Sequence, residues 1–165
     1  MIMTACSEAE TNWQALVVTN PSENFSVGAN LMMLMLEAAE GNWEDIDLIV
    51  RAFQTACGRL EHCGVPVVTA PAGLALGGGC EITMGGNAVR AAAETYIGLV
   101  EVGVGLIPAG GGCMFMLERV LEGVDKPLLS NLPFIQIAFE DIGMAKVATS
   151  GEEARELKYL RPYDV

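Results

Sequence analysis

Residues 70–81 read APAGLALGGGCE, and they begin at the end of a short apolar run, VVTA at 67–70, that is typical of a buried strand. Three consecutive glycines at 77–79 separate this strand from a predicted helix at residues 79–84. Glycines at such a junction let the backbone approach a ligand closely, and they leave N–H groups free at a helix N-terminus, where negative charge is favoured. A close-packed turn without a ligand has the same pattern, so the glycines alone leave both interpretations open.

Two nucleotide-binding motifs are excluded by the arrangement of the glycines. The phosphate-binding loop requires a Gly-Lys pair, and the sequence contains none. The dinucleotide fingerprint requires a third glycine three residues after Gly-x-Gly. That position is occupied by Ile82 in the first candidate and by Pro108 in the second.

The segments on both sides of the glycine run alternate between strand and helix patterns. Strands are predicted at residues 14–19, 67–70, 89–93 and 96–99, and helices at 31–40, 42–60, 79–84, 113–121, 134–146 and 150–157. Asn42 is the predicted N-cap of the second helix, and Ser150 with Glu153 forms a predicted capping box. Residues 100–112 read as a glycine-rich loop. This alternation indicates the α/β class, but it does not say which α/β fold is present.

Composition limits the possible partners and the cellular environment. The 165 residues suit one domain, and the net charge of −12 provides no basic surface for nucleic acid or an anionic membrane. No stretch is long and apolar enough to span a bilayer, and no signal peptide is visible. The five cysteines are odd in number and form no Cys-x-x-Cys, which favours reduced thiols and a cytoplasmic location. Only 18% of the residues are charged, which indicates either a rich core or an apolar surface that binds a partner.

The single histidine and two of the cysteines are interpreted as structural residues and not as catalytic ones. His62 is the only histidine, so a multi-histidine metal site is excluded, and we expect it to end the helix at 42–60. Cys80 and Cys113 are predicted to be small core residues.

Three segments together resemble the enoyl-CoA hydratase/isomerase (crotonase) superfamily. They are NFSVGANL at 24–31, the segment at 70–81, and YIGLVE at 96–101 followed by Pro108. Their order and spacing agree with the family, and the resemblance extends from about residue 16 to about residue 160. It implies an α/β protein with a crotonase-like ββα spiral core, truncated at both ends, in which residues 1–165 form a single partial domain.

The resemblance also implies an active site. The backbone N–H groups of Ala29 and Gly78 would form an oxyanion hole, and Glu81 and Glu101 would be the catalytic acid/base pair. Each glutamate lies in an apolar run, where a carboxylate is costly unless it has a role or a partner. An isolated helical glutamate is otherwise a solvated charge. No metal is expected. The implied substrate-binding residues are Ser26, Gly28, Leu31, Leu76, Gly77 and Pro108.

Two further segments, ETYIGLVE at 94–101 and EARELKYLRP at 153–162, resemble a narrower group. Its members are multifunctional fatty-acid oxidation proteins that join a 3-hydroxyacyl-CoA dehydrogenase to a hydratase. The implied reaction is hydration of trans-2-enoyl-CoA, an acyl-CoA thioester, in β-oxidation. No cofactor is expected in this segment because coenzyme A is part of the substrate, and NAD would bind only a dehydrogenase part elsewhere. We expect a homo-oligomer with little activity in isolation.

Two alternatives remain open. An enoyl-CoA isomerase would use the same oxyanion hole, although the presence of two glutamates favours a hydratase. A non-catalytic scaffold fragment would bind coenzyme A poorly or not at all. Two departures from the family concern coenzyme A: Asn30 stands where many relatives have Asp, and no basic residue precedes Arg51 to meet its phosphates.

Overall fold

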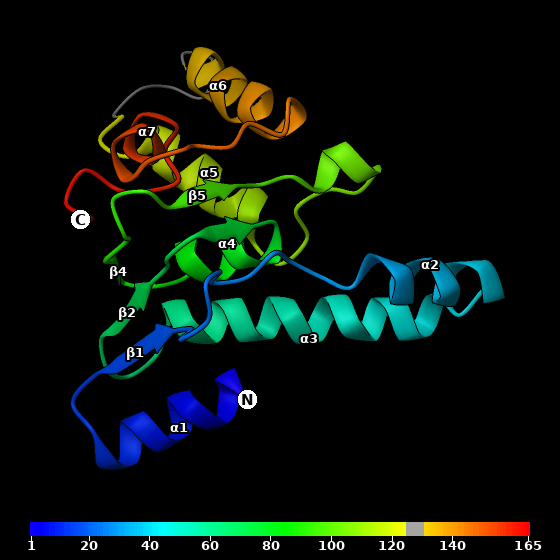
Figure 1. Cartoon of the computed structure of the whole chain (residues 1–165), viewed down its shortest axis with the longest axis horizontal. Helices are drawn as coiled ribbons and strands as arrows, with labels where there is room; N and C mark the ends of the chain where they lie inside the picture. Colours follow the sequence, from blue (N-terminus) through cyan, green and yellow to red (C-terminus); the bar gives the residue numbers. More distant parts are fainter. Residues whose placement is uncertain (125–130) are drawn as a thin grey trace.

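The computed structural model describes residues 1–124 and 131–165 (Figure 1). The elements in chain order are α1 (Ile2–Asn12), β1 (Leu16–Thr19), α2 (Leu31–Glu40), α3 (Trp43–Glu61), β2 (Val67–Ala70), β3 (Leu74–Leu76), α4 (Gly78–Met84), β4 (Ala88–Val89), β5 (Tyr96–Gly98), the 3₁₀ helix η1 (Glu101–Val104), α5 (Gly112–Leu121), α6 (Leu132–Gly143) and α7 (Gly151–Glu156). None of the helices in the two described ranges has the length and apolar character needed to cross a membrane.

The strands form two small parallel sheets. In the first, β2 lies between β1 and β4, with Leu16 opposite Val67 and Val68 opposite Ala88. In the second, β3 pairs with β5. Ser26 adds a parallel bridge to Ala75, so the extended segment before α2 lies beside β3.

The helices pack around these sheets. Figure 1 shows α3 as the longest helix, with α1 and α2 packed against it, and with α4 between α3 and the group formed by α5, α6 and α7. The α3 helix has one apolar side because its apolar residues recur every three or four positions, and its last members, Cys57 and Leu60, are fully buried.

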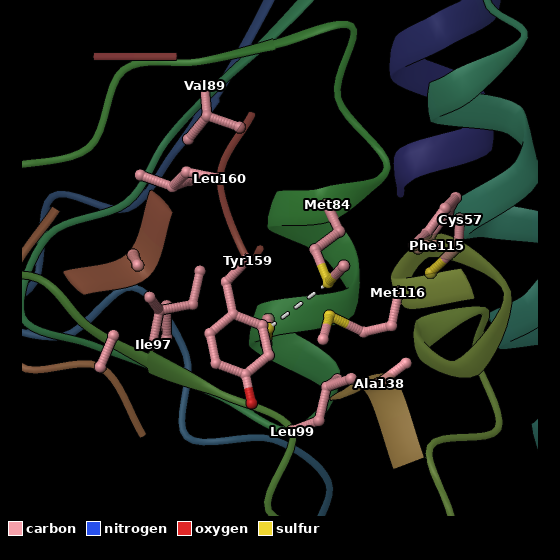
Figure 2. Close-up of a cluster of buried hydrophobic side chains, with 14 of the residues drawn as sticks. Cys57, Met84, Val89, Ile97, Leu99, Phe115, Met116, Ala138, Tyr159 and Leu160 are labelled. Carbon is pink, nitrogen blue, oxygen red and sulfur yellow. Dashed lines mark hydrogen bonds between the residues drawn. The ribbon is translucent and has the colours of Figure 1, made fainter. Parts of the chain in front are cut away.

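The main core lies beyond α4 as seen from α3. Figure 2 shows the Tyr159 ring close to Leu99, Met84 and Met116. Tyr159 is fully buried, and its hydroxyl donates a 2.8 Å hydrogen bond to the Lys146 carbonyl. This bond satisfies the polar end of the largest buried side chain in the described core.

Arg119 of α5 fixes the C-terminal end of α4. It is 6% exposed and donates to the carbonyls of Met84, at 3.0 Å, and Tyr159. Burial lowers the pKa of Arg119 to about 10. The last carbonyls of a helix lack partners within the helix and carry partial negative charge, so a guanidinium stabilises this end of α4.

Most of the predicted elements are present close to their expected bounds. The helices expected at 31–40, 42–60 and 113–121 correspond to α2, α3 and α5, and His62 follows α3 as its C-cap. The prediction did not include α1. The strand expected at 89–93 is wrong, because β4 ends at Val89 and the chain then turns to meet Val165 and Pro71 through the N–H groups of Ala91 and Ala92.

Two capping predictions are only partly correct. The Ser150 hydroxyl accepts from the Glu153 N–H, but the Glu153 carboxylate accepts from Thr149 and not from Ser150. The Asn42 side chain does not cap α3. Its amide donates instead to the carboxylates of Glu37 and Glu40, which α2 places within reach.

Candidate active site

A cavity of about 610 Å³ lies between α2, α3, the start of α4 and the segment around η1. Most of the residues that line it are apolar, and several come from one side of α2 and one side of α3. The charged residues among the described lining are Glu81 and Glu101, and no lysine or arginine lines it. A concave apolar site with a few convergent polar groups is the usual form of a small-molecule site.

The segment at 26–30 forms one wall of this cavity. Its hydrogen bonds to β3 run from the Ser26 N–H to the Leu74 carbonyl and from the Leu76 N–H to the Ser26 carbonyl, both at 2.9 Å. Gly28 has φ +91°, which turns the chain out of this pairing just before Ala29. Asn30 then caps α2 by accepting a 3.2 Å hydrogen bond from Met33.

The turn at Gly28 brings the two predicted oxyanion donors into one region. The Gly28 Cα is 4.0 Å from the position that a Cβ on Gly78 would occupy. Gly78 is the first residue of α4, so its N–H has no partner within the helix. Within residues 1–124 and 131–165, neither the Gly78 N–H nor the Ala29 N–H donates to a protein acceptor.

The junction between β3 and α4 requires glycine at position 77. Gly77 has φ +55°, and a Cβ there would lie 3.1 Å from Glu101 Oε1. This conformation and the absence of a side chain allow the Glu101 carboxylate to lie against the backbone that leads into α4.

Glu81 is held by the backbone at the start of α5. It is 2% exposed, and its Oε1 accepts hydrogen bonds from the N–H groups of Gly110, at 2.7 Å, and Gly112, at 2.9 Å. Burial raises the pKa of Glu81, while the donors at 110–112 act in the opposite direction. We refer to residues 110–112 as the amide cradle.

Glu101 has a different environment. It is the first residue of η1, and its buried Oε2 has no hydrogen-bond partner in the described structure. Burial and, less strongly, the negative charge of Glu81 together raise the pKa of Glu101 to about 7, against the lowering effect of backbone hydrogen bonds. The cavity therefore holds one carboxyl group, Glu81, that accepts two backbone hydrogen bonds, and a second, Glu101, whose pKa is near neutral pH.

Most of the residues predicted for the site line the cavity, and two do not. Those that line it are Ser26, Gly28, Ala29, Leu31, Gly77, Gly78, Glu81 and Glu101. Leu76 is outside the lining because it belongs to β3, where its N–H bonds to Ser26. Pro108 is buried beside Gly112, where its ring fills the space that a side chain would take.

The sequence interpretation missed the amide cradle and the contribution of α3. The signal for the cradle was the Gly-Gly-Gly run at 110–112 directly before a predicted helix, the same pattern as at 77–79. Phe53 falls in the helix predicted at 42–60 and was given no role in the site, although it lines the cavity.

The cysteine predictions are half correct. Cys80 is fully buried and burial raises its pKa well above the usual value, so it is an unreactive core thiol. Cys113 is exposed, and the prediction that it lies in the core is wrong because the second position of α5 faces away from the packed side. In the part of the chain that the structure describes, no group of three or more histidine, cysteine or acidic residues could hold a metal ion.

Comparison with known proteins identifies the same family that the three sequence segments resemble. Residues 2–123 match the family described as enoyl-CoA hydratase/isomerase. The chain is 40% identical over 164 residues to a protein of Bacillus subtilis named "Probable 3-hydroxyacyl-CoA dehydrogenase", covering 99% of this chain and 20% of that protein. It is 33% identical over 124 residues to the "Fatty acid oxidation complex subunit alpha" of Shewanella amazonensis, covering 73% of this chain and 17% of that protein.

A solved structure gives the fold. The enoyl-CoA hydratase of Bacillus anthracis superposes with a TM-score of 0.74 at 27% identity, over 96% of this chain and 56% of that one. The chain thus has a crotonase-type core, and it spans about a fifth of the length of the curated relatives it matches. On the family match and the shared core, this chain belongs to the enoyl-CoA hydratase/isomerase family.

Proposed function

We propose that the protein adds water to trans-2-enoyl-CoA thioesters to give 3-hydroxyacyl thioesters. The observation that carries this proposal is that Glu81 and Glu101 line one apolar cavity together with the free N–H groups of Ala29 and Gly78. Hydration requires an activated water, a proton donor and a site for negative charge. These four groups could supply all three.

The thioester oxygen would bind between the Ala29 and Gly78 N–H groups. Water attack at C3 moves electron density onto this oxygen, and two fixed backbone donors stabilise the resulting enolate. One such donor is worth about 3 kcal/mol of the barrier. The apolar lining strengthens this interaction because it keeps bulk water away from the developing charge.

The two glutamates would then have different roles. Glu81 Oε1 is held by two amides, so we assign Glu81 to orient the water and accept its proton as the C3–O bond forms. Glu101 has a pKa near 7 and therefore holds a proton part of the time at neutral pH, so we assign it to protonate C2. After the reaction Glu81 carries the proton taken from water and Glu101 has lost one, so transfer of that proton from Glu81 to Glu101 restores the starting state and balances the reaction.

The apolar sides of α2 and α3 would hold the acyl chain. Leu31, Met33 and Leu34 line the cavity from α2, and Ile46 and Val50 line it from α3. Burying such a chain gains about 0.8 kcal/mol per methylene, so the lining is suited to a hydrocarbon tail and not to a polar substrate.

The absorbance of the conjugated enoyl thioester provides the test. Crotonyl-CoA should lose its absorbance in the presence of the protein, and the product should be 3-hydroxybutyryl-CoA. A 3-enoyl thioester that gains conjugated absorbance would identify an isomerase instead. No turnover and no binding of either thioester would favour the scaffold alternative.

We also propose that the hydration step operates beside a 3-hydroxyacyl-CoA dehydrogenase. The support is chemical: the product of hydration is the substrate named for the Bacillus subtilis relative. NAD would act in that dehydrogenase part and not in this chain. The expected cytoplasmic location and homo-oligomeric state stay predictions.

A further inference from the structure

Phe53 of α3 occupies the space between two glycines that belong to different parts of the site. A Cβ built on Gly78 would lie 3.2 Å from the Phe53 Cζ. A Cβ built on Gly110 would lie 2.2 Å from Cε1 of the same ring. The ring therefore lies close to both residues: a side chain on Gly110 would clash with it, and one on Gly78 would be tightly packed against it.

The neighbouring residue holds the same loop by a hydrogen bond. The Gln54 side-chain amide donates to the Ala109 carbonyl at 2.8 Å. Because Gln54 is exposed, this hydrogen bond holds the loop against α3 without contributing to the packing of the core. Two successive residues of α3 thus reach Gly110, the first residue of the amide cradle, and Ala109, which precedes it.

Gly111 lies against the Phe115 ring and Gly112 against Leu99 and Pro108, whereas the atoms nearest to a Cβ built on Gly110 belong to Phe53 and Glu81. Gly110 is the first of three glycines, and Gly111 has φ +137°. Because glycine can adopt many backbone conformations, this run needs contacts with neighbouring residues to hold one of them. Of the Gly110 and Gly112 nitrogens that donate to Glu81 Oε1, the Gly110 nitrogen is the closer, at 2.7 Å. A contact that limits the motion of Gly110 therefore also limits the position of the Glu81 carboxylate.

We propose that Phe53 and Gln54 are positioning residues that fix the Gly78 N–H and the amide cradle relative to each other. The expected effect on kcat rests on the proposed function, whereas the contacts of Phe53 and Gln54 with residues 78, 109 and 110 do not depend on it. α3 is a 19-residue helix whose far end is anchored by buried Cys57 and Leu60, so it is a rigid support for both parts. Neither residue reaches the reacting atoms in this assignment.

The competing interpretation is that Phe53 is only a wall of the acyl cavity. A wall residue affects the affinity for the acyl chain and leaves the geometry of the glutamate unchanged. A positioning residue lowers kcat, changes KM for a short substrate little, and moves the signals of the groups that it supports. A misplacement of about 1 Å can cost about 100-fold in rate.

The test uses the whole chain and combines NMR with kinetics. In Phe53→Leu, we expect the amide resonances of Gly78, Gly110 and Gly112 to shift. The pKa of the Glu81 carboxyl, measured by carbon-13 NMR, should rise because the cradle donors that lower it are less well placed. Gln54→Met should shift Gly110 and Gly112 but leave Gly78 unchanged. The kcat for crotonyl-CoA should fall about 10- to 100-fold in Phe53→Leu.

Leu60→Ala is the matched control. It removes a fully buried side chain from the same helix, at a position whose cluster does not include the cradle. It should lower the unfolding temperature yet leave the Gly110 amide and the Glu81 titration unchanged.

A double-mutant cycle provides an independent readout. Gly110→Ala places a methyl group against the Phe53 ring, so its cost in unfolding free energy should be smaller in the Phe53→Leu background than in the wild type. Loss of the ring current shifts nearby amides by itself, so the Glu81 titration and kcat decide the outcome. Additive effects, together with an unchanged Glu81 titration and an unchanged kcat in Phe53→Leu, would overturn the proposal. A wild-type protein that neither binds nor hydrates enoyl thioesters would overturn the proposed function instead, and the NMR result would still decide the positioning role.

Discussion

The carboxylate of Glu81 accepts a 2.7 Å hydrogen bond from the N–H of Gly110, a residue 29 positions later in the chain. Glu101 Oε2, by contrast, is buried and has no hydrogen-bond partner among residues 1–124 and 131–165. Two carboxyl groups in one cavity therefore have unequal support, and this difference is the physical basis for giving them different roles.

Loss of either carboxyl group should remove most of the hydratase activity. We expect Glu81→Gln and Glu101→Gln each to lower kcat by about 100-fold or more, the usual scale for a lost acid or base, with little change in KM. Steady-state assays with crotonyl-CoA will measure both. Glu94→Gln is the control because Glu94 is exposed and outside the cavity. Near-normal turnover in either site variant would refute the assignment.

Gly78→Val should damage catalysis while leaving Glu81 in place. The new side chain would begin 3.2 Å from the Phe53 ring and would tilt the N–H that faces the thioester oxygen. Loss of one oxyanion donor predicts a fall in kcat of about 100- to 1000-fold. Gly58→Ala on α3 has free space around its new methyl group, and it should keep wild-type activity. A folded and fully active Gly78→Val protein is incompatible with the proposed oxyanion hole.

Glu101 should make the protein less stable as the pH rises. Its pKa is about 7 in the folded state and near 4.5 in the unfolded chain. Between these values the folded state binds more protons than the unfolded state, so the free energy of unfolding falls with increasing pH. Urea unfolding at pH 5 and pH 8 should show a smaller decrease for Glu101→Gln than for the wild type. Equal decreases would show that Glu101 titrates normally.

Tyr159→Phe should destabilise the main core without affecting chemistry. The substitution removes the donor to the Lys146 carbonyl while keeping the ring among its neighbours (Figure 2). We expect a loss of about 1 kcal/mol in the free energy of unfolding. Tyr163→Phe, at a side chain that is 60% exposed, is the control and should have no effect on stability. Equal effects of the two changes would argue against a structural role for the buried hydroxyl.

The outer side of α2 should promote self-association. Met32, Met35 and Leu36 are more than half exposed and lie outside the cavity lining, and α2 has no buried residue. An exposed apolar surface of this kind is typical of an interface. Light scattering should detect an oligomer, and Met32→Gln with Met35→Gln should shift it toward monomer. Met144→Gln, at an exposed site elsewhere, should not. A monomeric wild type would contradict the expectation.

Much of the fold could be predicted from the sequence because helical spacing is a strong local signal. The apolar recurrence in α3 and the Gly41 that ends α2 gave bounds close to those observed. The short strand β4 was overestimated, because its end depends on contacts with Val165 at the far end of the chain. The half-formed capping box at Ser150 depends on which neighbouring N–H lies closest to Glu153, and side-chain direction is not visible in a motif.

The site was predicted less evenly. Glu81 and Glu101 were implied by the resemblance to the family, and the cost of a carboxylate in an apolar run agreed with it. The glycines at 77–79 mark the turn before α4. The contact of Phe53 with Gly78 and Gly110 could not be identified, since it joins three segments that are distant in sequence. Leu76 was assigned to the site by the resemblance, yet it belongs to β3 and lies outside the cavity lining.

The separation between Glu81 and its donors has a consequence for how the chain folds during synthesis. When α4 emerges from the ribosome, the amides that satisfy Glu81 are still inside the exit tunnel, because Gly110 and Gly112 follow 29 and 31 residues later. A carboxylate buried without donors is unfavourable, so α4 cannot dock fully on its own. Its docking and the start of α5 should therefore form together as one cooperative step, late in the folding of the nascent chain.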